Sequence, residues 1–483
     1  MFAIRKRRVV VFLFLLSFTV YTVTAGGHFY SSDSWEAFLS TESIVEYHSL
    51  QIVKPSFEGE SPPSWLHFRT PDGKIYSRYG LGQTILFIPF YLAGKLMNPN
   101  AELTHFSDFA KYFYLTDFLF NPTITALTAV AMFYLGRKIG FSERMSVVLA
   151  LIFCFATQAW PYAKTLYNGP LVGLCVSVST YYLWSPKRRL DLLWAGLLTG
   201  FAGFVRYEFM IFGIPIGLYV LCVWRGSLRN RLSAWACFCI PLIGWVVVNA
   251  LYDFARVGSI FVTPLRDNPG YNTPILQGLY GLLLSPGVGL FVYSPILILS
   301  LVGFYDFWQR NKKGLVLLLT WVLPYLLASS AYTYWHGWAS WGTRYLVPMV
   351  PLMVLALGVA IDRRWATRQF RIVFAVLLSA SGLVNFLGVV GNTVTAFNMP
   401  NGILSLRENG EFVPAKALYD PRYSPIVYHA RLIFDSAELP LNVRLDVPLF
   451  YTFSQPLQFA VWILFAIAIG TFVFGLLREL SVL

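Results

Sequence analysis

The feature that most constrains the fold is a series of apolar runs along the whole chain, each about as long as a membrane helix. A helix needs roughly 20 predominantly apolar residues to cross the hydrocarbon core of a bilayer. Because 56% of the residues are hydrophobic and only 13% are charged, the sequence predicts an all-α polytopic membrane protein with about twelve transmembrane helices. The runs lie at residues 9–24, 115–136, 145–160, 168–185, 190–206, 208–224, 233–252, 287–307, 315–333, 345–361, 372–394 and 457–477.

The charged residues are divided unequally between the two sets of loops that these spans define. Lys and Arg cluster in one set, for instance at residues 5–8, 187–189 and 363–371, whereas the other set holds acidic and basic residues in near balance. This is the distribution that the positive-inside rule describes, and it predicts that both termini are cytoplasmic. It also accounts for the net charge of +13 without a nucleic-acid partner.

The spans divide the sequence into three parts. Residues 1–395 are predicted to form a transmembrane domain, 396–456 an outer polar loop or small cap, and 457–483 the last transmembrane helix with a cytoplasmic end. The run 9–24 follows a basic tetrapeptide and ends at small residues, which is also typical of a cleavable signal peptide. We expect a retained helix, with cleavage as the alternative.

A long outer loop, residues 25–112, is predicted to carry two helices that lie along the membrane surface. The second is the apolar run 84–97, which is short and is interrupted by Pro89. If this run crossed the membrane, every later basic loop would move to the outside. The first helix is indicated by apolar side chains at helical spacing, Trp35, Phe38, Leu39 and Val45.

Asp33 is the first acidic residue of the chain and lies in this loop, close to the predicted membrane surface. A carboxylate at such a position can serve as a catalytic base. With Glu36 three residues later, it also fits a helix N-cap with a capping-box partner. Both interpretations stay open, and they are compatible only if the carboxylate keeps one face for a substrate.

Two arginines stand out because the residues around them are apolar. Arg206 interrupts a hydrophobic stretch from 190 to 224, where a charge is costly and therefore indicates function; the alternatives are an internal pair with Glu208 or a tight outer turn. Arg344 is expected at a helix start, where main-chain N–H groups already favour an anion and the guanidinium adds a bidentate phosphate contact. Its alternative is a snorkelling side chain in an aromatic belt loop.

Further candidates are weaker when each is taken alone. Lys74, Arg78 and Lys164 are also outer cations; singly they are expected to be solvated, but with the two arginines they would form a cationic basin for a phosphate. His336 lies beside Trp338 in a Trp-rich segment whose rings would line an interfacial slot. The six histidines have no metal-ligand spacing, and no phosphate-binding glycine loop or nucleophile elbow is present. We therefore expect no metal and no chemistry on soluble nucleotides.

Four features together resemble the GT-C superfamily of polytopic glycosyltransferases, in particular protein O-mannosyltransferases, lipid A aminoarabinose transferases and their bacterial relatives. The segment 284–295 also resembles bacterial members. The first two features are Asp33 early in the first outer loop, and an amphipathic helix followed by residues 76–86 as a second juxtamembrane helix. The other two are the glycine-rich span 195–206 and the segment 335–348 around Arg344.

The resemblance implies a GT-C-like helix bundle with juxtamembrane helices in its first outer loop, in the cytoplasmic membrane of a bacterium, with the active site facing outside. It implies that a sugar is transferred with inversion from a polyprenyl-phosphate donor to a hydroxyl of a protein, lipid or glycan. The protein would contact membrane lipid, and the reaction would need no cofactor. Asp33 corresponds by position to the family's base and Arg78 to a cation near the donor phosphate. Further phosphate candidates are Arg206, Arg344, Lys74 and Lys164, and candidates for the acceptor or sugar pocket are Glu36, Tyr79, His336 and Trp338.

The chain also departs from the family's pattern. Relatives often carry an acidic residue before the second surface helix, where this chain has Tyr76 and Ser77, and the mannosyltransferases have one directly after the base, where Ser34 stands. The catalytic carboxylate is therefore expected to act almost alone.

The main alternative is a membrane transporter or lipid-linked-glycan flippase, which would place its ionisable residues at the midplane of discontinuous helices. In this sequence they gather in the outer loops instead. A polymerase or ligase of cell-wall glycans, with another fold, is a third alternative.

Overall fold

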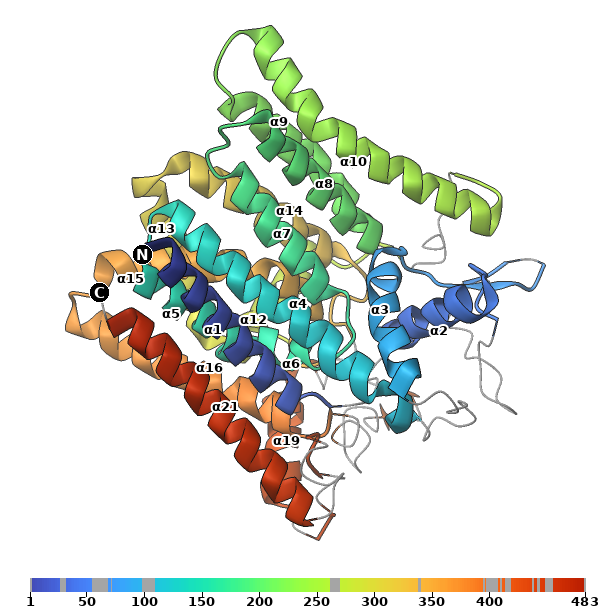
Figure 1. Cartoon of the computed structure of the whole chain (residues 1–483), viewed down its shortest axis with the longest axis vertical. Coiled ribbons are helices and arrows are strands. Elements are labelled where there is room, and N and C mark those ends of the chain that lie inside the picture. The colour runs from blue at the N-terminus through green and yellow to red at the C-terminus, as the bar shows by residue number, and fades with distance from the viewer. Residues whose placement is uncertain are drawn as a thin grey trace. The chain divides into compact units, whose positions relative to one another are not determined.

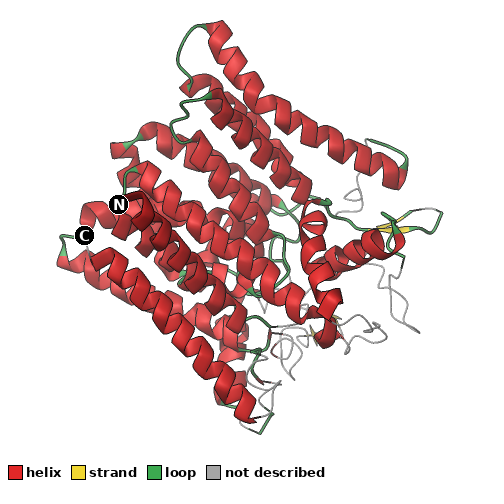
Figure 2. Ribbon diagram, viewed as in Figure 1, coloured by secondary structure: helices red, strands yellow, loops and turns green. Residues whose placement is uncertain are grey.

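The computed structural model describes residues 2–26, 32–53, 68–70, 72–97, 109–260, 270–337, 340–393, 396, 407–408, 411–412, 418–436, 438–440, 444–447 and 455–481. The chain divides into two units, each made of several segments (Figure 1). Unit 1 contains residues 1–26, 122–164 and 269–483, and unit 2 contains residues 27–121 and 165–268. The described residues are mostly helical, with two pairs of short strands (Figure 2).

Unit 2 consists of helices and one antiparallel pair of strands, in which Phe68 pairs with Tyr76. The first part of α4 (Phe109–Ile139) belongs to unit 2 and the rest to unit 1. The other elements of unit 2 are α2 (Ser32–Tyr47), β1 (Phe68–Arg69), β2 (Ile75–Tyr76), α3 (Gly82–Met97), α7 (Gly169–Leu183), α8 (Arg189–Val205), the 3-10 helix η1 (Tyr207–Phe212), α9 (Gly213–Val223) and α10 (Leu228–Val257).

The two helices predicted in the first outer loop are present as α2 and α3, and they pack against each other. Trp35, Phe38 and Leu39 are buried, as their helical spacing indicated. Pro89 does not interrupt α3, contrary to the prediction, because a proline removes only one main-chain hydrogen bond and a helix can accommodate it by bending. That these helices lie on a membrane surface stays a prediction.

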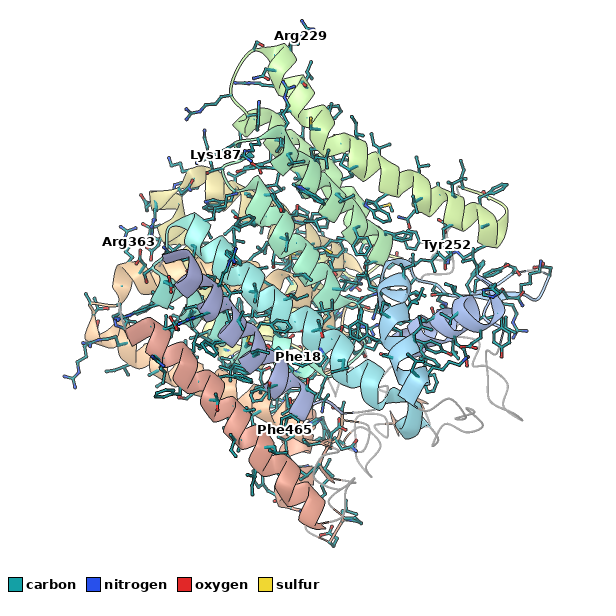
Figure 3. The ribbon with its side chains drawn as sticks, in the orientation of Figure 1. Phe18, Lys187, Arg229, Tyr252, Arg363 and Phe465 are labelled. Carbon is teal, nitrogen blue, oxygen red and sulfur yellow. The ribbon has the colours of Figure 1, made fainter. Side chains whose placement is uncertain are left out.

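Helices α7, α8 and α10 pack together in unit 2, with α8 in contact with both others. Ser179 of α7 and Thr199 of α8 share a hydrogen bond of 3.0 Å, which satisfies both hydroxyls without water, as an interface between membrane helices requires. Helix α10 extends between Arg229 and Tyr252, which lie near its opposite ends (Figure 3). Most of its apolar stretch is exposed, as expected for a surface that faces lipid.

Unit 1 is also helical, with one short antiparallel pair of strands, β3 (Arg407–Glu408) and β4 (Glu411–Phe412). Its helices are α1 (Phe2–Val23), α5 (Glu143–Phe155), α6 (Ala159–Ala163), α11 (Ile275–Leu284), α12 (Leu290–Tyr293), η3 (Pro295–Leu297), α13 (Ile298–Arg310), α14 (Lys312–Ala331), η4 (Arg344–Met349), α15 (Val350–Arg364), α16 (Arg368–Val390), η6 (Pro421–Tyr423), α19 (Pro425–Phe434) and α21 (Gln455–Ser481).

Helix α15 forms the core of unit 1. It is buried from Val350 to Ile361 and packs against α13 and α5. By contrast, α21 is largely exposed and lies along α1 (Figure 1), where Arg8 and Glu479 form an ion pair of 3.5 Å. The first and last helices of the chain are therefore antiparallel neighbours.

Six of the described helices are long and apolar enough to cross a membrane, and the chain is an integral, multi-pass membrane protein. The predicted count of about twelve spans is not confirmed. Two of the predicted spans are interrupted: 145–160 divides into α5 and α6, and 287–307 divides into α12, η3 and α13 at Pro295. The six helices are Leu119–Ile139, Leu228–Val257, Lys312–Ala331, Arg344–Arg364, Arg368–Val390 and Ile463–Leu480.

The described part of residues 396–456 is attached to the end of α16. Nδ1 of His429 in α19 lies 3.1 Å from the main-chain oxygen of Leu387, and Gly391 forms an antiparallel bridge with Leu445. The Asp446 amide donates to the Val390 oxygen at 2.8 Å. The boundaries predicted at residues 395 and 456 concern the position of this segment relative to the membrane, and they stay predictions.

Candidate active site

Asp33 lies in the first turn of α2, which begins one residue earlier at Ser32, and its side chain is partly exposed. Asp33 is therefore not the N-cap residue that one interpretation predicted. A carboxylate in the first helical turn is stabilised by the helix dipole and by the main-chain N–H groups that lack a partner inside the helix. This partly exposed position is compatible with a catalytic role for Asp33.

The carboxyl group of Glu36 binds a different segment of the chain. Its Oε2 atom accepts hydrogen bonds from Ser77 Oγ at 3.1 Å and from the Arg78 main-chain N–H at 2.8 Å. The side chain is only 1% exposed. Glu36 thus joins α2 to the segment that precedes α3, and it brings a second carboxyl group close to Asp33. That the catalytic carboxylate acts almost alone stays a prediction.

Burial is the main influence on the pKa of Glu36, and it raises that pKa to about 8. The hydrogen bond from the Arg78 amide opposes the shift, and the charge of Asp33 adds to it. Below pH 8 most Glu36 side chains are therefore neutral. A buried carboxyl group between a charged neighbour and few solvating groups is a common feature of functional sites.

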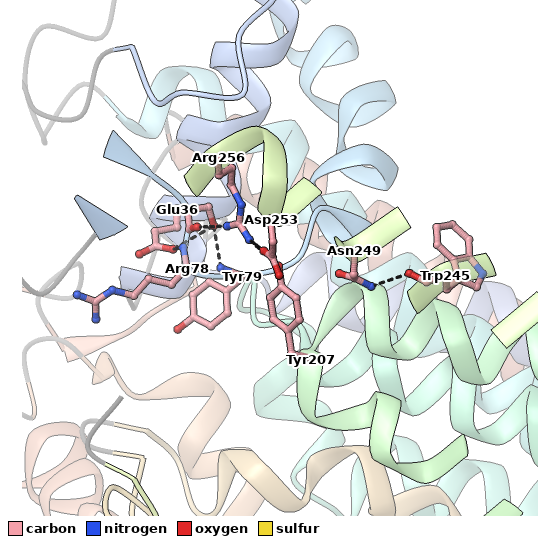
Figure 4. A network of polar contacts seen from close by, with 9 residues as sticks. Glu36, Arg78, Tyr79, Tyr207, Trp245, Asn249, Asp253 and Arg256 are labelled. Atoms are coloured by element: carbon pink, nitrogen blue, oxygen red, sulfur yellow. Dashed lines mark hydrogen bonds and ion pairs between the residues drawn. The ribbon is translucent and has the colours of Figure 1, made fainter. Parts of the chain in front are cut away.

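A second buried cluster at the end of α10 binds the same segment. Arg256 is 3% exposed, and its Nη1 atom donates to the main-chain oxygen of Ser77 at 2.6 Å. Its Nη2 atom donates to the Tyr207 hydroxyl at 2.6 Å and forms an ion pair with Asp253 (Figure 4). The guanidinium lies over the Tyr252 ring, 3.7 Å from the centroid.

None of Arg256, Asp253, Tyr252 and Tyr207 was among the candidates from the sequence. The predicted span ended at residue 252, so Asp253 and Arg256 were assigned to the loop that follows. In the structure they continue the helix at i and i+3, a spacing at which opposite charges meet on one helix face. An acid and a base three residues apart at the end of an apolar run were the signal in the sequence.

Arg78 and Tyr79 lie between these two clusters and the start of α3. The Arg78 side chain is half-buried and extends away from Arg256 (Figure 4), and the Tyr79 amide donates to Ser77 Oγ at 3.1 Å. Gly80 follows, and a Cβ atom there would lie 2.0 Å from the main-chain oxygen of Phe204 in α8. Only glycine permits so close an approach, so Gly80 allows the segment to pack against the end of α8.

The other two candidates in unit 2 form ion pairs. Arg206 ends α8, and its Nε atom donates to Glu208 Oε1 at 2.9 Å, which is the internal pair that the sequence allowed as an alternative. A phosphate bound there would share Arg206 with Glu208. Lys74 lies in the turn between β1 and β2, where it pairs with Asp72 at 2.9 Å, and both side chains are exposed.

Unit 1 contains the remaining candidates. Arg344 begins η4, as expected, and its Nη2 atom lies 3.3 Å from the Tyr345 hydroxyl. Its side chain packs against Gly337, whose φ of +68° favours glycine. Burial, together with a smaller effect of the Arg344 charge, lowers the pKa of His336 to about 4. His336 is therefore neutral at physiological pH. Trp338 lies outside the described residues.

Lys164 is buried in unit 1 and is held by other parts of the same unit. Its Nζ atom lies 2.7 Å from Asp446 Oδ2 and donates to the Val389 oxygen at 2.7 Å. A contact with a donor phosphate would require this ion pair to separate, which is costly inside a protein.

The structure thus brings Asp33, Glu36, Arg78 and Tyr79 together within unit 2, and His336 and Arg344 within unit 1. The convergence of Asp33, Arg206 and Arg344 on one pocket involves both units and stays a prediction. The unit 2 cluster contains the Asp33 carboxylate near a helix start, the mostly neutral carboxyl group of Glu36 beside it, and the guanidinium of Arg78, whose main chain binds Glu36. Such a set can accept a proton and stabilise an anionic leaving group.

No protein-family model matches the sequence, and no curated protein matches it either. The structure is similar to that of ArnT from Cupriavidus metallidurans bound to undecaprenyl phosphate, with a TM-score of 0.51 and 11% identity, over 97% of this chain and 75% of that chain. It is also similar to the archaeal oligosaccharyltransferase AglB from Archaeoglobus fulgidus in complex with an inhibitory peptide and a dolichol-phosphate, with a TM-score of 0.49 and 12% identity.

The alignment with AglB covers 79% of this chain, and the chain spans about half, 55%, of the AglB length. At 11% identity, the likeness to ArnT concerns the fold alone. At that level it agrees with the resemblance found in the sequence: this chain shares the fold of ArnT.

Proposed function

We propose that this chain is an inverting glycosyltransferase that moves a sugar from a polyprenyl-phosphate donor to an acceptor hydroxyl at the outer face of the membrane. The observation that carries the proposal is the joining of α2, which bears Asp33, to the Ser77–Arg78 segment through the buried carboxyl group of Glu36. A base and a cation for the leaving group belong together in this reaction. The fold likeness to ArnT, whose structure holds undecaprenyl phosphate, supports the donor class.

In the proposed reaction the acceptor hydroxyl gives its proton to the Asp33 carboxylate. The acceptor oxygen forms a bond to the anomeric carbon of the sugar from the side opposite the phosphate. The bond between the anomeric carbon and the phosphate oxygen breaks, and polyprenyl phosphate leaves with the electron pair. A positioned base contributes about 10²- to 10⁴-fold to such a step.

The leaving phosphate gains negative charge as the bond breaks. Arg78 is the first cation proposed for this phosphate, because its own amide makes the contact with Glu36. Arg206 and Arg344 are the further cations of the proposal. Fixed guanidinium groups stabilise a developing anion more than water does, because they need no reorientation at the moment of reaction. Lys164, in its buried ion pair, and Lys74, in an exposed one, are left out of the proposal.

The test is Asp33→Asn, assayed with purified protein, a panel of radiolabelled polyprenyl-phosphate sugars and a crude membrane fraction as the source of acceptors. Wild-type protein is expected to release the sugar from at least one donor, and the variant to lose about 100-fold or more of that rate. Asp362→Asn is the matched control, because Asp362 forms an exposed ion pair with Arg310 in unit 1. Equal rates for wild type and Asp33→Asn, with both proteins folded, would exclude Asp33 as the base.

A further inference from the structure

The Ser77–Arg78 peptide is bound from two sides by buried ionisable residues of two different helices. Glu36 of α2 accepts the Arg78 amide at 2.8 Å, and Arg256 of α10 donates to the Ser77 oxygen at 2.6 Å. Ser77 Oγ makes a further contact to Glu36 at 3.1 Å. A main-chain segment outside regular secondary structure is thus held by three hydrogen bonds, all of them to ionisable side chains.

These contacts use main-chain atoms and the serine hydroxyl, and so none of them occupies the Arg78 guanidinium. They constrain the position of the Arg78 main chain, whereas the guanidinium end of its side chain extends in another direction (Figure 4). The hydrogen bond from the charged Arg256 is stronger than one between neutral groups, and burial strengthens all three contacts further. The arrangement is therefore suited to holding the Arg78 backbone in one place.

Glu36 and Arg256 together form a clamp on the Ser77–Arg78 peptide, and neighbours in unit 2 hold Arg256 in place. Arg256 is oriented by its ion pair with Asp253, by the Tyr207 hydroxyl and by the Tyr252 ring. The Asp253 carboxylate also accepts the Tyr207 hydroxyl at 3.1 Å. The guanidinium thus has partners on several sides, so it has little freedom to leave the Ser77 oxygen.

We propose that Glu36 and Arg256 are positioning residues that hold Arg78 at a set distance from Asp33. The proposal rests on the function proposed above, in which Asp33 is the base and Arg78 binds the donor phosphate. Since Asp33 and Glu36 are three residues apart on one helix, fixing the Arg78 amide to Glu36 fixes Arg78 relative to the base. Arg256 then prevents the segment from moving away from α2.

The charged and titratable groups that face Glu36 determine how the clamp responds to pH. They are Asp33 on the same helix, Arg78 on the bound segment, and Tyr252 of α10; Arg256 and Asp253 lie on the far side of Ser77. Because the pKa of Glu36 is raised to about 8 by burial, the group is mostly neutral below pH 8 and gains a negative charge above it. That charge would oppose an anionic donor near Arg78.

The first experiment measures hydrogen–deuterium exchange of residues 74–81 in the full-length protein without any donor. Glu36→Ala and Arg256→Lys are expected to raise the exchange of the Arg78 amide at least 10-fold. Arg256→Lys keeps a positive charge beside Asp253, so it preserves the fold, but an ammonium cannot reproduce the two-sided contact of a guanidinium. The control variants are Glu46→Gln, at the other end of α2 with Lys95 and Tyr91, and Arg229→Gln, exposed at the far end of α10.

The second experiment measures transfer per folded molecule. A displacement of about 1 Å at a site of this kind costs about 100-fold, so Glu36→Ala and Arg256→Lys should lower kcat/KM by that factor, mainly through kcat. Glu36→Gln keeps an acceptor oxygen for the Arg78 amide, so at pH 7 it should lose less of the wild-type rate than Glu36→Ala does. It should also lack the decline that we expect for the wild type above pH 8.

The outcomes separate the two proposals. If no donor is active with the wild type, the proposed function fails, while the exchange experiment still decides whether the clamp exists. Unchanged exchange of residues 74–81 in both variants would overturn the clamp. Increased exchange with unchanged kcat/KM would overturn the positioning role and leave Glu36 and Arg256 as structural residues only.

Discussion

Lys164, which taken alone was expected to be a solvated outer cation, lies deep inside unit 1 beside Asp446. Lys164 and Asp446 are 2% and 0% exposed and lie 2.7 Å apart. They are far apart in the sequence, and the pair connects the end of α6 to the segment that follows α19. A buried ion pair adds little net stability over an apolar pair of the same size, but the loss of one partner leaves a charge that nothing compensates.

We therefore expect Lys164→Met to destabilise the protein by about 3–5 kcal/mol. The double variant Lys164→Met/Asp446→Leu should recover most of that loss, because it removes both charges. The measurement is the midpoint of thermal unfolding in detergent. Lys74→Met is the matched control, since Lys74 pairs with Asp72 on the exposed hairpin turn, and it should leave the midpoint unchanged. A single variant as stable as the wild type would contradict the structural role of the pair.

At the scale of elements, irregular backbone is found where side chains of another helix satisfy it. The break between α12 and α13 leaves main-chain groups without partners inside the helix, and α16 supplies them: Ser381 Oγ accepts the Ile296 amide at 2.7 Å, and Asn385 donates to the Tyr293 oxygen at 2.9 Å. Non-helical backbone at membrane depth needs such partners, because lipid offers none. Proline at 295 signals the break in the sequence, but not which residues compensate for it.

The contact between the segment before α3 and the end of α8 gives an element-scale prediction. Gly80→Ala would place a Cβ atom 2.0 Å from the Phe204 oxygen, so the start of α3 must move away from α8. We expect a large loss of transfer activity and a lower midpoint of thermal unfolding, because Arg78 and Tyr79 move with the segment.

Gly244→Ala is the matched control, since a Cβ atom at Gly244 in α10 would meet no atom within 4 Å. Alanine is favoured over glycine inside a helix, so this control should retain activity and be no less stable. If Gly80→Ala behaved as Gly244→Ala does, the close approach to Phe204 would not position the segment.

For the whole molecule, charge distribution and helix packing make a joint prediction about sidedness. The basic residues near the N-terminus indicate the cytoplasm, and the ion pair between Arg8 and Glu479 joins the first helix to the last. Both ends of the chain are then expected on the cytoplasmic side, with the turn at Asp72 outside.

Cysteine labelling with a membrane-impermeant reagent tests this prediction in a variant whose five native cysteines are replaced. Asp72→Cys, at an exposed turn, should react in intact cells. Arg8→Cys and Arg229→Cys, both exposed in the structure, should react only after the membrane is opened. Labelling of Arg8→Cys in intact cells would reverse the predicted orientation and place Asp33 on the cytoplasmic side.

The sequence alone was sufficient for those properties that depend on composition and local periodicity. Apolar runs of membrane length predict a helical membrane protein because lipid cannot satisfy free main-chain groups, and the helical spacing of Trp35, Phe38 and Leu39 predicts α2. The family resemblance predicted the fold that the likeness to ArnT confirms. Asp33 and Arg78 were found through their place in that pattern.

Only the tertiary structure decided which side chains meet. Glu36 binds the Arg78 amide of another segment, Arg256 reaches the Ser77 oxygen from a helix almost 180 positions later, and Lys164 forms a buried pair with Asp446. The number of unbroken spans also depended on breaks that neighbouring helices stabilise. The physical reason is common to all of these: hydrogen bonds and ion pairs between distant segments depend on packing geometry, which no local pattern of residues encodes.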